Sequence, residues 1–408
     1  MATSPRVFFV NRYYAPDESA TSQMLTDLAE GLAGSGIEVE VFCSRQLYGD
    51  AGAALPSQEV LRGVRVRRGA TTRFGRHSLI GRWLDYSTFY LCSAFYLLAR
   101  VRRGNVLVVN TDPPLLSLIG WLVARCNSAS LVNWLQDLYP EVATRLAASP
   151  IPRPVEALIR AVRDRSLATA RINIVLGTRM REYLIGRGIA ATRISICENW
   201  ADESRLHPLA SARSELRARL GLRDSFIVAY SGNLGRAHDA TTILEAACAL
   251  ESDPGVTFLM VGGGTGMRSL KMQVSARGLT NCRFAPYQPR EGLSDSLAAG
   301  DVHLVSLRPE LEGLIVPSKL YGVLAAGRPV VFIGHPDGEL AQLVALAGIG
   351  FSVGSGDSAG LCRALRALRD DETARVRMGA RARELFEERY TRAAAVARWR
   401  EVLRTLAA

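Results

Sequence analysis

The sequence predicts an α/β protein with two doubly wound domains, each a parallel sheet covered by helices on both faces. Its 408 residues are too many for one compact core and suffice for two α/β domains. Short apolar runs alternate with helical stretches, which is typical of parallel strands buried on both faces. The alternation stops in the polar, turn-rich segment 198–208 and then starts again, so we expect one domain on either side of it.

The first domain is expected over residues 1–200. Apolar runs predict strands at 7–10, 37–42, 106–109, 130–134 and 172–176, with helices at 23–32, 115–126 and 154–169. The loop 11–22 connects the first strand to the first helix.

The second domain repeats the pattern over residues 205–389. Strands are expected at 226–231, 257–261, 282–284, 302–306 and 329–333, with helices at 241–250 and 372–389. A last helix covers 391–408, and its Trp399 needs a surface to cover. We expect this helix to pack back on the first domain. The two sheets are predicted to face each other across a cleft, with ligands beyond the carboxyl ends of the strands.

The chain is basic, with a formal net charge of +11. Residues 1–200 carry 24 arginines against 16 acidic residues, whereas residues 201–408 carry 26 basic against 23 acidic residues. The excess in the first half suits an anionic membrane surface, anionic small molecules or nucleic acid, or it is a solvated surface. No nucleic-acid-binding module is recognisable, so we expect no nucleic-acid partner.

Cysteine and histidine usage indicates a reduced protein without a metal. The seven cysteines are scattered and form no C-x-x-C pair. No secretory signal pattern opens the chain, so a cytoplasmic location is expected. The five histidines are dispersed, and we expect neither a metal nor a cofactor.

The turn 231–239 follows an expected strand and is the first of three segments that point to phosphate binding. Gly232 and Gly235, with Asn233 between them, let the backbone approach an anion, and the next helix offers N–H groups. Arg236 adds a guanidinium that can hold phosphate oxygens, and His238 follows it closely. Glycine turns of this kind also serve as plain strand-to-helix connections.

The block 312–330 is the second segment. A loop containing Glu312, Gly313, Leu314 and Ile315 leads to a helix that starts near Pro317 and includes Leu320. Ser318 and Lys319 fall in its first turn, where the helix dipole favours anions. A cation opposes that dipole, and only two lysines occur against 48 arginines, so Lys319 indicates a compensating phosphate.

The third segment is the proline-bracketed loop 284–289. Tyr287 offers an aromatic ring and Gln288 an amide, and together they suit a nucleobase. The same loop is otherwise a simple turn.

These motifs resemble those of the retaining family-4 glycosyltransferases of the GT-B fold, which has two Rossmann-like domains. The resemblance is closest to bacterial enzymes of surface-polysaccharide and O-antigen assembly. The matching pieces occur in order along nearly the whole chain, at 13–16 with 19–21, 136–141, 199–202, 231–239 and 316–322.

The resemblance implies a nucleotide-sugar donor, namely a UDP-sugar. It also implies a lipid-linked saccharide acceptor, such as a saccharide carried on a polyprenyl diphosphate. Arg236 and Lys319 look like the pair that neutralises the donor diphosphate. The implied donor-binding set is Gly232, Asn233, Gly235, Arg236, Tyr287, Gln288, Glu312, Gly313, Leu314, Ile315, Ser318, Lys319 and Leu320. The implied acceptor-side set is Tyr14, Ser19, Ala20, Asn199 and Trp200. Asp137 falls where such enzymes place a catalytic or acceptor-positioning residue, and it is otherwise a helix cap or turn aspartate.

The chain departs from the family at one pair of positions. Family members carry two glutamates eight positions apart, which here fall at Leu314 and Gly322, while Glu312 is out of register. No carboxylate is placed as a covalent nucleophile. Our hypothesis is a front-side displacement in which the leaving phosphate helps to deprotonate the acceptor, with Arg236 and Lys319 stabilising its charge.

Residues 79–101 form an apolar stretch that Arg82 and Asp85 interrupt, so we expect no spanning helix. The stretch is either a buried helix of the first domain or an interfacial helix at the inner face of the plasma membrane. The arginines beside it are Arg73, Arg76, Arg82, Arg100, Arg102 and Arg103.

Two other functions remain open. A nucleotide-sugar epimerase would share the base and diphosphate contacts, but no acid/base residues for it can be placed. A non-enzymatic nucleotide or polyanion binder would account for the charge but not for the ordered motifs.

Overall fold

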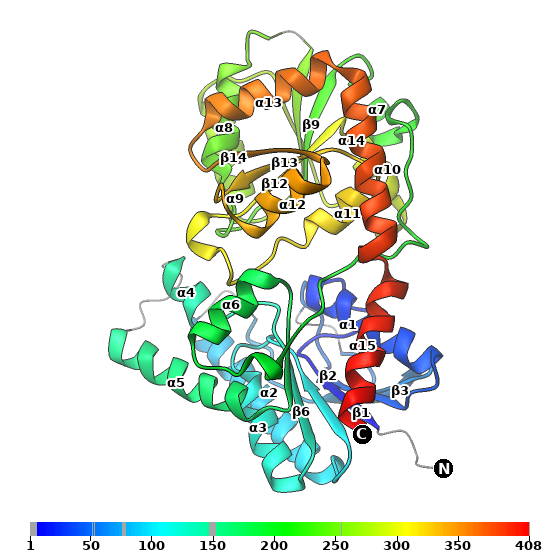
Figure 1. Ribbon diagram of the computed structural model, residues 1–408, viewed down its shortest axis with the longest axis vertical. Coiled ribbons are helices and arrows are strands. Elements are labelled where there is room, and N and C mark those ends of the chain that lie inside the picture. The colour runs from blue at the N-terminus through cyan, green and yellow to red at the C-terminus, as the bar shows by residue number, and fades with distance from the viewer. Residues whose placement is uncertain are drawn as a thin grey trace. The chain divides into compact units, whose positions relative to one another are not determined.

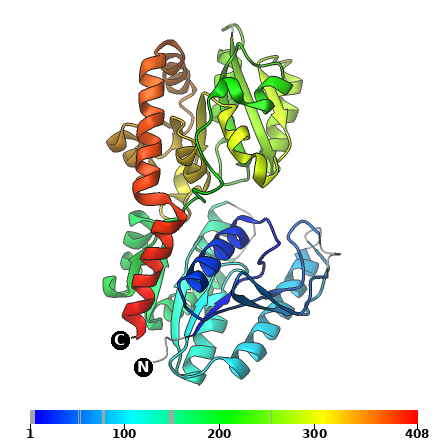
Figure 2. The same cartoon turned by 90° about the vertical axis from the view of Figure 1, so that its right-hand side faces the viewer.

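The computed structural model describes residues 6–50, 52, 54–75, 79–146, 152–253 and 255–407. The chain forms two compact units, each with its own sheet (Figures 1 and 2). The first, called the N-unit, contains Met1–Glu198 and Arg392–Ala408, and the second, called the C-unit, contains Asn199–Thr391.

The N-unit contains an eight-stranded sheet in the order β3-β4-β2-β1-β5-β6-β7-β8. All neighbours are parallel except β3, which pairs antiparallel with β4. The strands are β1 (Val7–Val10), β2 (Val39–Ser44), β3 (Gln58–Leu61), β4 (Val64–Gly69), β5 (Val106–Val109), β6 (Ser130–Trp134), β7 (Ile172–Val175) and β8 (Ile194–Ile196).

Helices cover both faces of this sheet. They are α1 (Ala20–Gly34), α2 (Leu79–Arg100), α3 (Leu116–Asn127), α4 (Glu141–Arg145), α5 (Arg153–Thr169), α6 (Thr178–Gly186), the 3-10 turn η1 (Ala191–Arg193) and α15 (Arg392–Ala407). Helix α3 packs between α2 and α5, and α1 packs against α15. Strand β1 reaches both layers because its side chains alternate: Phe8 joins the core under α2 and α3, whereas Phe9 meets α15.

A tryptophan of the last helix packs in the core of the N-unit. Trp399 is fully buried, with its ring centroid 5.0 Å from that of Trp134 and 6.2 Å from that of Phe9. Truncating a buried tryptophan typically costs about 3–5 kcal/mol. The expected core contact of Trp399 is confirmed.

The C-unit contains a six-stranded parallel sheet in the order β11-β10-β9-β12-β13-β14. Its strands are β9 (Phe226–Asn233), β10 (Val256–Gly263), β11 (Cys282–Ala285), β12 (Val302–Ser306), β13 (Val330–Gly334) and β14 (Gly350–Gly354). Counted within the unit this is the doubly wound order, in which the winding reverses between β9 and β12. Ligands of such sheets bind beyond the carboxyl ends of the strands at this reversal.

The helices of the C-unit also lie on both faces of its sheet. They are α7 (Glu215–Arg219), α8 (Ala240–Ala249), α9 (Thr265–Ala276), α10 (Leu293–Ala298), α11 (Lys319–Ala325), α12 (Glu339–Ala347), α13 (Ser358–Asp370) and α14 (Glu372–Leu385), with 3-10 turns at Ser211–Arg213, Arg290–Gly292 and Pro309–Leu311 and a π-helical turn, η5 (Phe386–Tyr390). Val228 and Tyr230 pack under α8, α9 and α13, whereas Ile227 and Ala229 pack toward α7.

All ten predicted strands occur, and four further strands were not predicted. These are β3 and β4, which form a hairpin at one edge of the first sheet, together with β8 and β14, each at a sheet edge. Edge strands are buried less completely, so their sequences lack the continuous apolar runs that mark central strands.

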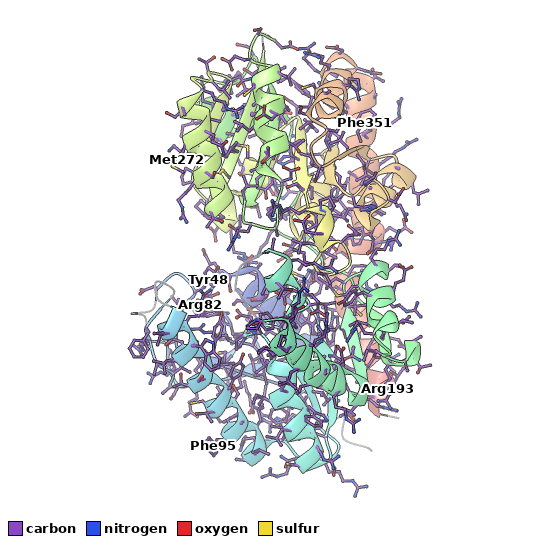
Figure 3. The ribbon with its side chains drawn as sticks, turned by 90° about the vertical axis from the view of Figure 1, so that its left-hand side faces the viewer. Tyr48, Arg82, Phe95, Arg193, Met272 and Phe351 are labelled. Carbon is purple, nitrogen blue, oxygen red and sulfur yellow. The ribbon has the colours of Figure 1, made fainter. Side chains whose placement is uncertain are left out.

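Helix α2 is buried on one face only. Asp85 and Phe89 lie inside, and the Asp85 carboxylate accepts hydrogen bonds from the Thr72 hydroxyl (2.8 Å) and the Gly75 N–H (3.0 Å). The opposite face carries exposed apolar side chains, including Phe95, which Figure 3 shows with Arg82 on this helix. The helix therefore belongs to the core of the N-unit through one face, as the first alternative expected, and exposes its other face. Within the described ranges, no helix is long and apolar enough to cross a membrane.

Candidate functional site

The reversal of strand order in the C-unit brings together four residues that are far apart in the sequence. Gly232 lies near the end of β9 and Ser306 ends β12, while His238 and Lys319 follow these two strands. The Lys319 Nζ lies 2.9 Å from His238 Nε2, and His238 Nδ1 lies 2.6 Å from the Ser306 backbone oxygen. A Cβ atom placed on Gly232 would lie 3.1 Å from the Lys319 Cε. We call these four residues the lysine cluster.

The positions of the protons in the lysine cluster follow from the partners of the histidine. A backbone oxygen can only accept, so His238 carries its proton on Nδ1 and donates it to Ser306. The Nε2 lone pair then accepts a hydrogen bond from Lys319. Burial, assisted by the charge of Lys319, lowers the pKa of His238 to about 3, so the ring is neutral near pH 7.

Lys319 carries a charge that the described residues do not compensate. Burial lowers the pKa of Lys319 from 10.5 to about 8. Among the described residues no carboxylate forms an ion pair with it, and its Nζ lies 5.3 Å from the centroid of the Tyr230 ring. A shift of this size corresponds to about 3 kcal/mol against the charged form. An anion bound beside the ammonium would offset that free energy.

Glycines allow the strand ends to approach this lysine closely. Gly232 has φ +117° and Gly262, at the neighbouring end of β10, has φ +123°. A Cβ on Gly262 would lie 2.3 Å from the Gly232 oxygen, closer than any side chain allows. Sequence reasoning did not include Gly262 among the site residues.

The rest of the turn 231–239 presents polar groups to solvent. Asn233 and Arg236 are exposed, and Gly235 is partly buried. The turn ends at Asp239, whose carboxylate accepts the Thr242 N–H at 3.0 Å and caps α8. Arg236 therefore lies on the surface two residues before the histidine of the lysine cluster.

The Glu312 carboxylate has a structural contact that the sequence did not indicate. Its Oε1 accepts the Glu339 N–H at 2.8 Å, at the first residue of α12. A carboxylate at a helix N-terminus is stabilised by the exposed N–H groups and the dipole. The Glu312 side chain is thus bonded to the N-terminus of α12. A sugar hydroxyl that bound Glu312 would compete with the Glu339 N–H for this carboxylate.

The remaining residues of the block 312–320 differ in exposure. Leu314 and Leu320 are fully buried, so they hold the loop and α11 in place from within. Gly313 turns the chain with φ +73°, and Ile315 is partly buried. Ser318 is exposed at the N-cap position of α11, and its hydroxyl makes no capping hydrogen bond.

Gly322 faces apolar neighbours. A Cβ at this position would lie 3.6 Å from Leu297 Cδ1 and 4.0 Å from Leu206 Cδ1. A glutamate at this position would therefore begin between two leucines.

In the loop 284–289, the Tyr287 side chain is exposed and the Gln288 amide is hydrogen-bonded. Tyr287 is 60% exposed, and a Cβ on Gly263 would lie 3.0 Å from its ring. The Gln288 amide accepts from Arg219 Nη2 at 3.3 Å and donates to the Pro286 oxygen at 2.9 Å. The tyrosine side chain is thus exposed, whereas the glutamine has partners at both ends of its amide.

In the N-unit, Asp137 lies at a small cavity beyond the end of β6. The cavity measures about 20 Å³, enough for one water-sized group, and Thr111 also lines it. Burial raises the pKa of the Asp137 carboxyl, and a hydrogen bond with the Thr111 side chain opposes the shift. The N-cap of α4 is Pro140, so Asp137 does not cap that helix.

A buried ion pair fixes the chain just after Asp137. Arg163 of α5 donates to both carboxylate oxygens of Glu141, at 3.0 and 2.7 Å, and to the Tyr139 oxygen at 3.0 Å. The Tyr183 hydroxyl donates to Glu141 at 2.8 Å. Removing one partner of such a pair costs about 3–5 kcal/mol. Sequence reasoning missed Arg163, because its helix shows no signal for this contact.

The predicted acceptor-side residues of the first loop are mostly engaged within it. Tyr14 is 1% exposed, burial raises its pKa, and its hydroxyl finds no hydrogen-bond partner among the described residues. The Ser19 N–H and hydroxyl both donate to the Asp17 carboxylate. Ala20 is exposed and begins α1.

Asn199 and Trp200 are buried, at 2% and 3% exposure, at the start of the C-unit. They adjoin Ala201, whose N–H donates to the Tyr390 oxygen at 3.0 Å and which forms a bridge with Thr391. These two residues therefore lie where the beginning and the end of the C-unit are hydrogen-bonded together.

The chemistry of the two units differs. The lysine cluster can bind an anion and stabilise a developing negative charge, while Asp137 offers a carboxyl that accepts or donates a proton. Over the described ranges, no group of three or more histidine, cysteine, aspartate and glutamate residues could hold a metal ion.

Two family models match the chain. The model "Glycosyl transferase 4-like domain" matches residues 19–200, and the model "Glycosyl transferases group 1" matches residues 212–385. The sequence is 28% identical over 340 residues to the colanic acid biosynthesis glycosyl transferase WcaI of Escherichia coli, covering 81% of this chain and 83% of that protein.

Solved structures share the fold over nearly the whole chain. The sucrose-phosphate synthase of Thermosynechococcus elongatus has a TM-score of 0.78 and 19% identity, with coverage of 98% of this chain and 99% of that chain. Anabaena HepE in complex with UDP-glucose has a TM-score of 0.73 and 16% identity, with the same coverage. Both are similar in fold to the chain described above, which has two parallel-sheet α/β units.

Lys319 should titrate near pH 8 in the ligand-free protein, because burial disfavours its charged form. The chain has only two lysines, so NMR of lysine labelled at Cε gives two signals, and the Lys271→Arg variant assigns them. Since the folded pKa lies below the unfolded value of 10.5, the contribution of this group to stability rises from pH 8 to 10.5. A midpoint above about 10 for Lys319 would contradict the structure.

Proposed function

We propose that this chain, which belongs to the family-4 glycosyltransferases of the GT-B fold, transfers a hexose or N-acetylhexosamine from a UDP-sugar to a lipid-linked saccharide, retaining the anomeric configuration. The observation that carries the proposal is the uncompensated ammonium of Lys319 at the carboxyl edge of the C-unit sheet. A donor diphosphate supplies the negative charge that this group lacks.

The lysine cluster would act on the leaving group. As the bond from the anomeric carbon to the β-phosphate oxygen breaks, negative charge collects on that phosphate. Lys319 and Arg236 stabilise this charge, and His238 keeps the ammonium in place without adding charge of its own. In a front-side displacement the acceptor oxygen bonds to the same face of the anomeric carbon, and its proton passes to the leaving phosphate.

Other predicted residues receive roles on the same reasoning. Tyr287 stacks on the base, for which uridine is supported by the complex of Anabaena HepE with UDP-glucose. The loop around Gly313 and Ile315 approaches the donor through its backbone, while Glu312 holds this loop to α12. Asp137, a carboxyl whose pKa burial raises, is proposed to position the acceptor hydroxyl.

We infer the lipid-linked acceptor and the membrane location from the exposed apolar side chains of the N-unit. Nine of the seventeen large apolar side chains that are exposed in the described residues lie on α2, α3 and α5, which pack side by side. We call them the apolar helix face; they are Ile80, Trp83, Leu84, Leu91, Phe95, Leu122, Val155, Leu158 and Val162. Arg73 and Arg100 are exposed beside it, while Arg76 lies outside the described residues.

This face is proposed to lie on the cytoplasmic surface of an anionic membrane. Apolar side chains next to arginines suit a helix layer that rests in the headgroup region. A lipid-linked acceptor would be reached from that position, in keeping with a role in polysaccharide assembly like that named for the colanic acid relative.

Replacing Lys319 by Met tests the donor site. Lys319→Met keeps an unbranched side chain but removes the ammonium beside the Tyr230 ring, so we expect turnover to fall by well over tenfold and donor-induced stabilisation to disappear. The measurements are release of UDP from UDP-sugars and the thermal shift with UDP-glucose.

The matched control is Lys271→Met, which removes the other lysine, exposed on α9 and 5.9 Å from the Phe284 ring centroid. This variant should bind and turn over donor like the wild type. Equal behaviour of the two variants would show that Lys319 does not bind the donor.

The apolar helix face predicts binding to anionic vesicles. Trp83 and Phe95 are 75% and 73% exposed on α2, so Trp83→Ser with Phe95→Ser should weaken cosedimentation with phosphatidylglycerol vesicles by about tenfold or more. Raising the salt concentration should weaken the remaining binding.

The control removes two equally exposed apolar side chains from the C-unit, with Met272→Ser and Val376→Ser, which are 67% and 64% exposed. The proposal is wrong if the wild type stays in the supernatant at low salt, or if both double variants lose binding equally.

A further inference from the structure

A second basic site lies in the N-unit at the sheet edge opposite the carboxyl ends. A cavity of about 360 Å³ opens where α3 and α5 end and where β6 and β7 begin. Four arginines line it, Arg125, Arg165, Arg171 and Arg193, of which Figure 3 labels the last. We call this cavity the arginine pocket.

The charge in the arginine pocket is not balanced. No acidic residue lines the cavity, and no carboxylate of the described residues forms an ion pair with any of the four arginines. Two other arginines of the N-unit do form ion pairs: Arg163 pairs with Glu141, and Arg187 pairs with Asp164 at 2.7 Å. In the pocket, Arg193 is partly buried and the other three arginines are exposed, so water screens part of the repulsion among the four charges, and an anion between them would offset the rest.

Helix ends account for two of the four arginines, and one of these is Arg125 in the last turn of α3. Cations are favoured at helix C-termini, and Arg193 donates to the oxygen of Ala170, the C-cap of α5. The guanidinium groups of Arg125, Arg165 and Arg171 make no hydrogen bond to a described residue. Three arginines at one cavity therefore lack a structural partner within the described part of the chain.

We infer that the arginine pocket binds a phosphate-bearing ligand. Guanidinium groups hold phosphate oxygens through forked hydrogen bonds, and Ser130 adds a hydroxyl to the lining. The cavity is large enough for a phosphate ester with an organic group, and Trp121 supplies an aromatic surface for that group. The inference does not depend on the transfer reaction.

The surroundings of the pocket suggest where the phosphate comes from. On α5, Leu158 and Val162 are exposed and precede Arg165 at helical spacing, so they lie on the same stripe of the helix. On α3, the exposed Leu122 lies one turn before Arg125. The apolar helix face therefore adjoins the arginine pocket. A lipid whose chains contact this face could place its phosphate head group in the pocket. A soluble phosphate ester shares the same chemistry.

The test compares two variants with the same change of charge. Arg165→Gln with Arg171→Gln removes two charges from the pocket, and Arg363→Gln with Arg377→Gln removes two exposed arginines from α13 and α14. One arm measures thermal shifts with inorganic phosphate and glycerol 3-phosphate, in the Lys319→Met background so that the lysine cluster does not contribute. The other measures cosedimentation with phosphatidylcholine vesicles with and without phosphatidylglycerol.

We expect the pocket variant to weaken binding by roughly tenfold in at least one arm, and the control variant to bind like its parent. Loss in the soluble arm assigns a free phosphate ester, and loss only with phosphatidylglycerol assigns a lipid head group. In an otherwise wild-type chain, the shift with UDP-glucose should stay unchanged in the pocket variant, which separates this inference from the donor site. Equal binding by pocket and control variants in both arms would overturn it.

Discussion

The ammonium of Lys319, which pairs with no carboxylate of the described residues, is the constraint around which the C-unit is arranged. Lys319 loses about 3 kcal/mol of charge stabilisation through burial, and its polar partner among the described residues is a neutral histidine. An apolar side chain would fill the same space without the free-energy cost of burying a charge. An anion bound beside the ammonium would recover this free energy, and in the proposed function that anion is a diphosphate.

The elements around Lys319 serve this arrangement. The winding of the sheet reverses between β9 and β12, and glycines at 232 and 262 let the strand ends come close to the ammonium. Ser306 fixes the tautomer of His238, which then accepts from the lysine instead of repelling it. In the N-unit, the buried charges of Glu141 and Arg163 compensate each other, unlike the charge of Lys319. This ion pair fixes the chain beside Asp137.

The parts of the fold that could be predicted from the sequence are those that local pattern encodes. Central parallel strands are continuous apolar runs and were found, whereas the hairpin β3–β4 and the edge strands β8 and β14 were not. Gly232 and Lys319 were singled out by residue type, and the structure brings them together. The contact of His238 with Ser306 and the bond from the Glu339 N–H to Glu312 join residues distant along the chain, so no local pattern could indicate them.

The central claim is that the ammonium of Lys319 meets a diphosphate, and its pKa in the presence of UDP tests this most directly. An anion beside the group favours the charged form, so bound UDP should raise the Lys319 midpoint by about one unit or more above its ligand-free value near 8. The Cε signal of this lysine, followed through a pH titration with saturating UDP, gives the value. An unchanged or lowered midpoint, with UDP shown to be bound, would contradict the account.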